Sequence, residues 1–283
     1  MRLWTAAMHE RADRLAERAQ EERRRRDSVD TLFEMVDRDG EVGGGIIAGA
    51  LAYRLFIWLL PLALVAVAGL GIAADAKSES PEAAARTLGL DGLVSESVAN
   101  AAKGSGRWYA LLVGIPVLVY TTRSVLRALI GAHRLVWLDV RGAGSKPTLL
   151  GSLRLLGLLL CFPVVSAVAS GMRSWSTGPG ILVTLAAAVP FAGLWLLIAI
   201  RLPHLGAPWR ALIPGALVFA FGIEVLQAVT AYVLAPYAIA KQGTYGALGA
   251  AAALLFGLFL ISRLVVASAV INATLWERRA RGP

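Results

Sequence analysis

The chain has 283 residues, of which 57% are hydrophobic, and its mean hydropathy is +0.64. An ordinary soluble domain is closer to half apolar, and the excess here lies in runs of about twenty residues, the length that crosses a hydrocarbon core of ~30 Å. The formal charge is +9, and the single cysteine, Cys161, excludes an internal disulfide and a cysteine metal site. The composition therefore predicts an integral membrane protein and excludes a soluble globular domain.

Residues 1–44 are predicted to form a charged, amphipathic helical tail in the cytoplasm. Apolar residues recur at helical spacing over residues 2–26, where a basic run closes the segment. The run consists of Arg23, Arg24, Arg25 and Arg26. Two interpretations of it stay open, a solvated helix face or contact with anionic lipid headgroups. A second apolar stripe over residues 29–36 predicts a short helix that lies in the membrane interface.

Six apolar segments predict an all-α, polytopic transmembrane domain over residues 45–273, because each is long enough to cross the bilayer as a helix. The predicted spans are residues 46–73, 108–131, 149–171, 180–200, 211–236 and 246–272. The longest loop joins the first two spans and carries the signal of a small amphipathic helix near residues 93–102. Residues 274–283 are predicted to form a basic cytoplasmic tail.

The basic residues outside the spans set the predicted orientation. With the N-terminus inside, the inner segments carry seventeen lysines and arginines and the outer segments six. Because cytoplasmic segments of membrane proteins carry such an excess, both termini are predicted in the cytoplasm. The same bias accounts for the positive charge without nucleic acid as a partner. Membrane lipids are the expected partners, and the sequence leaves the oligomeric state open.

Five arginines lie inside the predicted spans or at their margins. They are Arg54, Arg123, Arg127, Arg154 and Arg263. An arginine at mid-membrane depth costs at least ~3 kcal/mol on insertion scales, so each needs a partner or a route to the interface. Arg127 and Arg154 are shallow enough for their side chains to reach the interface. Arg54 and Arg263 are expected to lie ~12–14 Å deep, estimated from the rise of a helix.

The acidic residue expected inside a span is Glu224, with Gln227 one turn further along the same helix face. Two hypotheses follow. In the first, Arg54, Arg123 and Arg263 line an inward-facing basic cavity that accepts an anionic small molecule or lipid, and Glu224 is their counter-ion or a proton-coupling site. In the second, Glu224 and an arginine form a structural lock between helices, and the protein supports the cell envelope without transport.

The chain lacks the sequence signals of an enzyme or a cofactor protein. No glycine-rich loop with a lysine is present to hold a nucleotide phosphate, and no serine or cysteine has a recognisable nucleophile motif. A metal-dependent nuclease needs several convergent carboxylates, and the acidic residues are too scattered for such a site. The three histidines are far apart, so we expect no metal, no cofactor and no enzymatic activity.

Several short motifs in order resemble the YihY/virulence factor BrkB family of bacterial inner-membrane proteins, once labelled as ribonucleases. The matching motifs are Leu51-Ala52-Tyr53 with Pro61, the arginine-bearing segment 123–129, Arg201-Leu202-Pro203, Pro214-Gly215-Ala216, the segment 245–249 and the segment 269–273. The chain departs from the family pattern at Trp58, at Val270 and at Ser268. The resemblance covers residues 37–273 and implies six transmembrane helices and a multi-pass location in the plasma membrane. It implies no settled activity.

Overall fold

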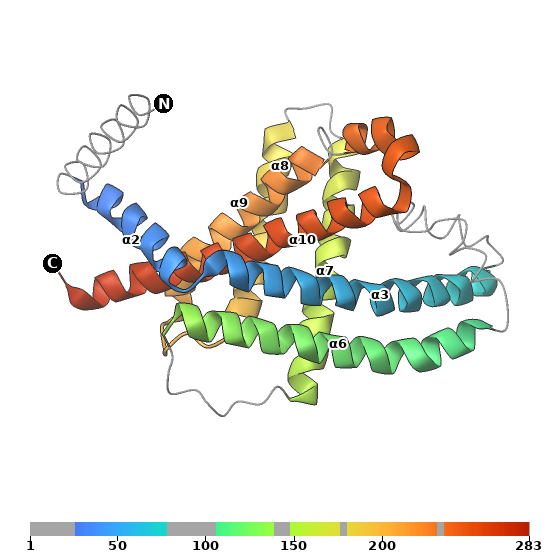
Figure 1. Ribbon diagram of the computed structural model, residues 1–283, viewed down its shortest axis with the longest axis horizontal. Coiled ribbons are helices and arrows are strands. Elements are labelled where there is room, and N and C mark those ends of the chain that lie inside the picture. The colour runs from blue at the N-terminus through green and yellow to red at the C-terminus, as the bar shows by residue number, and fades with distance from the viewer. Residues whose placement is uncertain (1–25, 78–105, 139–147, 176–179, 231–234, 283) are drawn as a thin grey trace, which may run out of the picture.

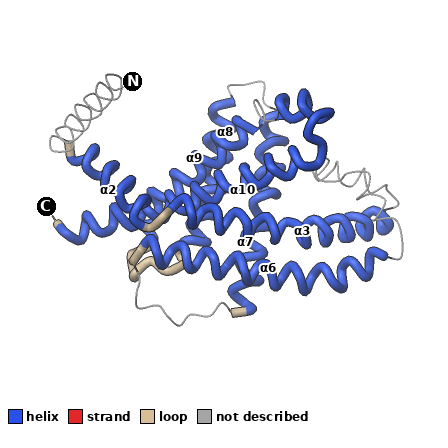
Figure 2. Tube along the Cα trace, viewed as in Figure 1, coloured by secondary structure: helices blue, strands red, loops and turns tan. Residues whose placement is uncertain are grey.

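The computed structural model describes residues 26–77, 106–138, 148–175, 180–230 and 235–282. These residues are helical and contain no strand, which confirms the predicted all-α class (Figures 1 and 2). The predicted helix over residues 2–26 with Arg23, Arg24 and Arg25, and the predicted loop helix near residues 93–102, lie outside the described residues.

Five of the described helices are long and apolar enough to cross a membrane. They are α3 (Gly44–Lys77), α6 (Gly106–Val136), α7 (Leu149–Trp175), α9 (Ile213–Val229, with the turn before it) and α10 (Ala235–Arg281). The fourth predicted span corresponds to α8 (Gly180–Ala199), whose described apolar stretch is Ala188–Ala199. Five of the six predicted spans are therefore helices of membrane-crossing length, and the count of six stays a prediction.

The last helix extends well beyond the last predicted span. α10 has 47 residues and continues to Arg281, so the segment predicted as a basic tail, residues 274–283, is largely its final turns. Good helix formers and arginines fill these turns, and no proline interrupts them. The helix therefore carries basic side chains from the apolar part of the molecule out to its end.

The second predicted amphipathic helix is α2 (Asp27–Glu41), which leads into α3 through Gly43 in a left-handed conformation, φ +66°. α2 packs against α10, so the start of the described chain and its C-terminal end lie at the same end of the molecule (Figure 1). Leu32 and Val36 on α2 stay 62% and 68% exposed. The polar face of α2 thus meets protein, while part of its apolar face does not.

Aromatic side chains with polar partners join the helices in the core. The Trp195 ring of α8 stacks on Phe219 of α9 with ring centroids 4.4 Å apart, and its Nε1–H donates to Ser268 Oγ of α10 at 2.7 Å. The Nε1–H of Trp58 on α3 donates to Thr122 Oγ1 of α6 at 2.8 Å. Each ring supplies a large apolar contact, and each N–H finds the partner that a buried indole needs.

The start of α9 is held by α10. The first N–H groups of a helix have no acceptor within the helix, and lipid supplies none. The N–H of Gly215 donates to Asn272 Oδ1 at 2.8 Å, so a side chain of α10 satisfies one of these donors. A Cβ atom added at Gly215 would overlap the Ser268 backbone oxygen and the Asn272 side chain. The two helices therefore approach closely only because position 215 is glycine.

We predict that Gly215→Ala lowers the free energy of unfolding by about 1–3 kcal/mol, the usual cost of overpacking a close contact. Thermal unfolding of the purified protein in detergent measures the effect. Gly193→Ala on α8 is the matched control, because a Cβ there meets nothing within 4 Å. Equal unfolding temperatures for the two variants would contradict the close approach of α9 and α10.

Candidate functional site

A groove of about 630 Å³ lies between α6, α7 and α8. Its walls are mostly apolar, with two arginines among them. The lining residues are Leu126 and Ile130 of α6, Thr148, Gly151, Arg154, Leu155, Gly157 and Leu158 at and along α7, and Leu197, Ile198, Arg201 and Leu202 at the end of α8. A groove of this size and composition has room for an apolar chain and carries charge for an anionic group.

The two arginines reach the groove from neighbouring helix ends. Arg154 lies five residues after the first residue of α7, and Arg201 lies two residues after the last residue of α8. α7 and α8 pack together, and both arginines are exposed. Among the described residues, neither guanidinium group pairs with a carboxylate. Two positive charges for which the described residues supply no carboxylate therefore face one cavity.

The polar end of the groove is fixed by a helix cap. Thr148 precedes α7, and its Oγ1 accepts a hydrogen bond from the N–H of Gly151 at 3.0 Å. The Oγ–H of Ser152 donates to the Thr148 carbonyl oxygen at 3.1 Å. A threonine in this position satisfies an orphan donor of the first turn and stops the helix there. The cap therefore orders the first turn of α7, the helix that carries Arg154.

The predicted site residues do not line this groove. Arg54 of α3 donates to the hydroxyl of Ser124 on α6, and the Arg123 side chain next to that serine is exposed. Glu224 is 5% exposed within α9, and the Nε2 of Gln227 donates to Ser166 Oγ of α7 at 3.4 Å. The structure therefore brings Arg54 and Arg123 to one pair of helices, and it places Glu224 and Gln227 on α9.

Arg263 has a different partner from the one that we expected. Its Nη1 and Nη2 donate to the two carboxylate oxygens of Asp39, each at 3.0 Å. The sequence analysis assigned Asp39 to the cytoplasmic tail and considered Glu224 the available acid. Because α2 leads directly into α3 beside α10, Asp39 lies within reach of the Arg263 guanidinium fork. The two-point geometry is the strong form of an arginine–carboxylate contact, so Arg263 is already neutralised.

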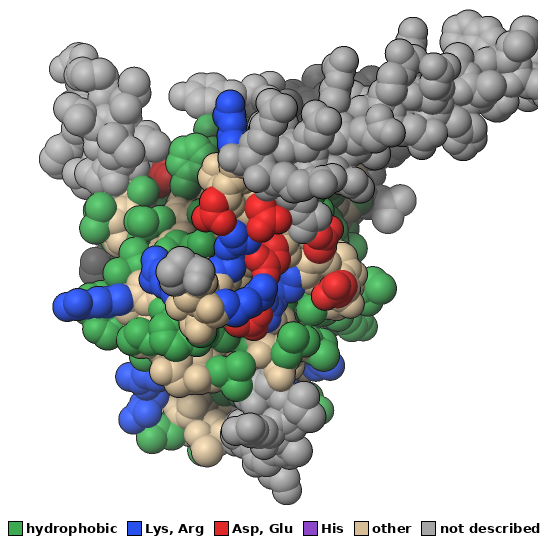
Figure 3. Space-filling model, turned by 90° about the vertical axis from the view of Figure 1, so that its left-hand side faces the viewer, with side chains coloured by type: hydrophobic (Ala, Val, Ile, Leu, Met, Phe, Trp, Pro, Cys, Tyr) green, Lys and Arg blue, Asp and Glu red, His purple; other side chains and the backbone are tan. Residues whose placement is uncertain are grey.

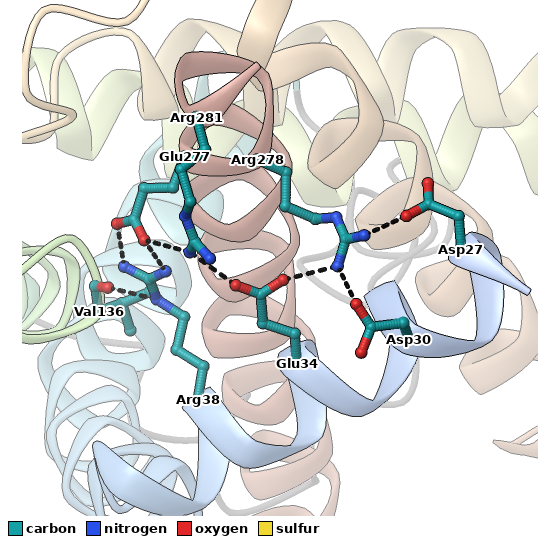
Figure 4. A network of polar contacts seen from close by, with 8 residues as sticks. All are labelled: Asp27, Asp30, Glu34, Arg38, Val136, Glu277, Arg278 and Arg281. Carbon is teal, nitrogen blue, oxygen red and sulfur yellow. Dashed lines mark hydrogen bonds and ion pairs between the residues drawn. The ribbon is translucent and has the colours of Figure 1, made fainter. Parts of the chain in front are cut away.

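A larger set of charges joins α2 to the end of α10, and we call it the α2–α10 clasp. It consists of Asp27, Asp30, Glu34, Arg38, Glu277, Arg278 and Arg281 (Figure 4). The Nη1 of Arg278 donates to Asp30 Oδ2 at 2.7 Å and to Glu34 Oε2 at 2.8 Å, and its Nη2 contacts Asp27. Figure 3 shows these acidic and basic side chains gathered on one face of the molecule.

The inner end of the clasp is buried. The Arg38 side chain is 8% exposed, and it donates to the two carboxylate oxygens of Glu277 at 2.8 and 2.5 Å. Its Nε donates to the Val136 backbone oxygen at 3.0 Å, which satisfies a carbonyl at the end of α6 (Figure 4). One arginine therefore ties three helices together, and breaking this contact leaves a largely buried charge without a partner.

Sequence reasoning missed Arg201 as a groove residue and Asp39 as a counter-ion. The sequence analysis used Arg201 as a basic loop residue and as part of a family motif, although it directly follows an apolar span and Arg154 lies in the first turns of the preceding span. Basic residues at adjoining ends of two consecutive spans are a signal that such a groove leaves in a sequence. Asp39 leaves no comparable signal, because its pairing depends on the angle between α2 and α10.

The comparison with protein families uses nearly the whole chain. The model of the family described as virulence factor BrkB matches residues 37–283. This chain belongs to the BrkB virulence-factor family. The match confirms the resemblance seen in the sequence, and it includes all five membrane-length helices, the groove, Arg38 and Asp39. No curated protein and no solved structure matches the chain.

This BrkB-family protein is an integral membrane protein, because its family membership agrees with its five long apolar helices. Its polar features divide into two classes. Arg38, Arg263 and Arg278 pair with carboxylates in the protein, whereas Arg154 and Arg201 face an open groove. The first class has its counter-ions within the protein, and the second lines the groove.

We predict that Arg38→Gln lowers the free energy of unfolding by about 2–3 kcal/mol, because it removes the buried partner of Glu277 and of the Val136 carbonyl. The control is Arg279→Gln, since Arg279 is exposed and forms no ion pair with a described residue. Thermal unfolding in detergent compares the two. A loss no larger for Arg38→Gln than for Arg279→Gln would disprove the structural role of the clasp.

Proposed function

We propose that this protein is a plasma-membrane carrier of an anionic solute or lipid, with both termini in the cytoplasm. The observation that carries the proposal is the separation of its arginines into two sets. One set pairs with carboxylates of the protein. The second set consists of Arg54, Arg123, Arg127, Arg154 and Arg201, which lie on α3, α6 and α7 and just after α8 and pair with no described carboxylate. Arg210 and Arg279 also lack such a pair, but they lie on other elements and are not part of this set.

The second set gathers in one part of the molecule. Arg54 lies ten residues after the start of α3 and contacts Ser124 of α6. Ser124 stands between Arg123 and Arg127 in the sequence of α6. Arg154 and Arg201 lie at the adjoining ends of α7 and α8. Arg154 and Arg201 line a groove that α6 also lines, so the five arginines lie on neighbouring helices. The excess of basic residues in the predicted inner loops supports a cytoplasmic position for them.

A guanidinium group that lies within the membrane without a carboxylate partner is costly, and an external anion offsets this cost. The planar fork of arginine binds a phosphate or a carboxylate through two parallel hydrogen bonds, which lysine does not reproduce. Several guanidinium groups on neighbouring helices would provide a site for an anion that enters from the cytoplasmic side. We further propose Glu224, which is buried in α9, as the carboxylate that couples proton movement to transport.

A second candidate function is support of the cell envelope without transport. The observation that favours it is the α2–α10 clasp with the Arg263–Asp39 pair, which shows that this fold also uses arginine as a structural group. Under this alternative the second set of arginines contacts lipid phosphates only passively, and no solute crosses.

Flux into proteoliposomes tests the carrier function. The panel contains inorganic phosphate, small carboxylates and fluorescent phospholipids, with protein-free vesicles as the baseline. We expect flux of one class above the baseline and a loss of about tenfold or more in the double variant Arg123→Gln/Arg127→Gln, equivalent to about 1.4 kcal/mol. Arg54→Lys is expected to lose flux while it retains the unfolding temperature, because the charge stays and the fork is lost.

The control for this experiment is Arg279→Gln, which removes one exposed positive charge outside the second set and should leave the flux unchanged. Flux at the baseline for every member of the panel, from protein that unfolds cooperatively, would rule out the carrier and favour the envelope-support alternative.

A further inference from the structure

We infer that the groove between α6, α7 and α8 is a binding site for an anionic glycerophospholipid. The phosphate would lie against Arg154 and Arg201, and an acyl chain would follow the apolar walls. This inference rests on the proposed function in that it names the ligand of two of the five arginines. It concerns binding alone, however, so it is testable without transport.

The groove has a polar end and an apolar end. Thr148 and Arg201 lie at the ends of their helices, whereas Leu158 of α7 and Leu126 of α6 lie nine and ten residues from the nearer ends of theirs. Thr148 and Leu158 are ten residues apart, a distance of ~15 Å along a helix. Half of a hydrocarbon core is also ~15 Å thick. The groove therefore changes from charged to apolar over the depth of one lipid leaflet.

The direction of the Arg154 side chain agrees with this polarity. A long side chain on a helix points toward the N-terminus of that helix, here toward Thr148 and the polar end. Arg154 would thus extend toward the first turn of α7, and both it and Arg201 line the groove. A phosphate that contacts both guanidinium groups would accept charge-assisted hydrogen bonds from each of them. These are the strongest hydrogen bonds that the groove residues can donate at neutral pH.

The apolar wall distinguishes a lipid from a soluble anion. A free phosphate or a small carboxylate would use only the two arginines and the Thr148 hydroxyl. The Leu197 side chain is 52% exposed, and Leu158 and Leu126 add further apolar surface to the groove wall. Such a surface is favourable only against hydrocarbon, and in a membrane the amphiphile that joins hydrocarbon to phosphate is a phospholipid. The charge and the walls together therefore select a lipid.

Gly157 supplies the space that the acyl chain would occupy. It lies in the groove wall on α7, and a Cβ added there meets nothing within 4 Å. A large side chain at position 157 would therefore fill the groove without removing either charge. Gly157→Phe therefore tests the acyl wall, and substitution of Arg154 and Arg201 tests the phosphate contact.

Native mass spectrometry of the detergent-purified protein tests the site with three probes, phosphatidylglycerol, phosphatidylcholine and glycerol phosphate. We expect wild-type protein to retain phosphatidylglycerol with at least tenfold higher affinity than phosphatidylcholine. Arg154→Gln/Arg201→Gln should weaken phosphatidylglycerol binding at least tenfold. Arg154→Lys/Arg201→Lys should bind phosphatidylglycerol with an affinity between those of the wild type and the glutamine double variant. Gly157→Phe should weaken the binding of both lipids.

The matched controls change the same groups outside the groove. Arg210→Gln/Arg279→Gln removes two exposed charges, and Gly193→Phe adds the same bulk at an open position of α8. Both should bind phosphatidylglycerol as wild type does. Thermal unfolding of every variant establishes that it is folded.

Three results would overturn the inference. They are unchanged phosphatidylglycerol binding in the arginine double variant, glycerol phosphate binding as tight as that of the lipid, and an equal loss in the control variants. Flux separates this inference from the carrier function. Wild-type protein that binds phosphatidylglycerol as expected but moves no substrate supports the groove and refutes the carrier. Carrier flux without groove-dependent lipid binding would support the carrier and refute the lipid site in the groove.

Discussion

Polar groups that a helix carries into a membrane must find partners there, because the hydrocarbon core of the bilayer offers neither a donor nor an acceptor. The core of this BrkB-family protein is organised by that requirement. The indole N–H groups of Trp58 and Trp195 bond hydroxyls on neighbouring helices, and Asn272 accepts from the first turn of α9. Each contact joins two helices, so the same bonds that remove a desolvation cost also fix which helices are neighbours.

The same requirement explains why the two sets of arginines differ. Arg38 and Arg263 lie where α2, α3 and α10 converge, and carboxylates from α2 or α10 reach both. The bundle brings no described carboxylate to Arg154 and Arg201, which instead flank an open groove. Among the described residues, carboxylate partners are available where three helices converge and not at the groove. This difference is what favours an anionic ligand in the groove.

Much of the fold follows from runs of apolar residues, since length and composition suffice to predict helices that cross a membrane. The start of α3 and the amphipathic α2 were predictable for this reason. The pairing of Arg263 with Asp39 was not, because it depends on the angle at which α2 meets α10. The groove required the packing of α7 against α8, and no pattern in either helix alone specifies it.

The clasp joins residues that are far apart in the order of synthesis. Asp27 and Arg278 contact each other across a separation of 251 residues. When α2 leaves the ribosome, its acidic face lacks the contacts with Arg278 and Arg281, and it gains them only after the last turns of α10 are made. The entropy of closing so long a loop grows slowly with length, so the many charged contacts at its ends can offset it. The α2–α10 contacts therefore form late in synthesis, and a protein truncated before Glu277 would leave the acidic side chains of α2 without these arginines.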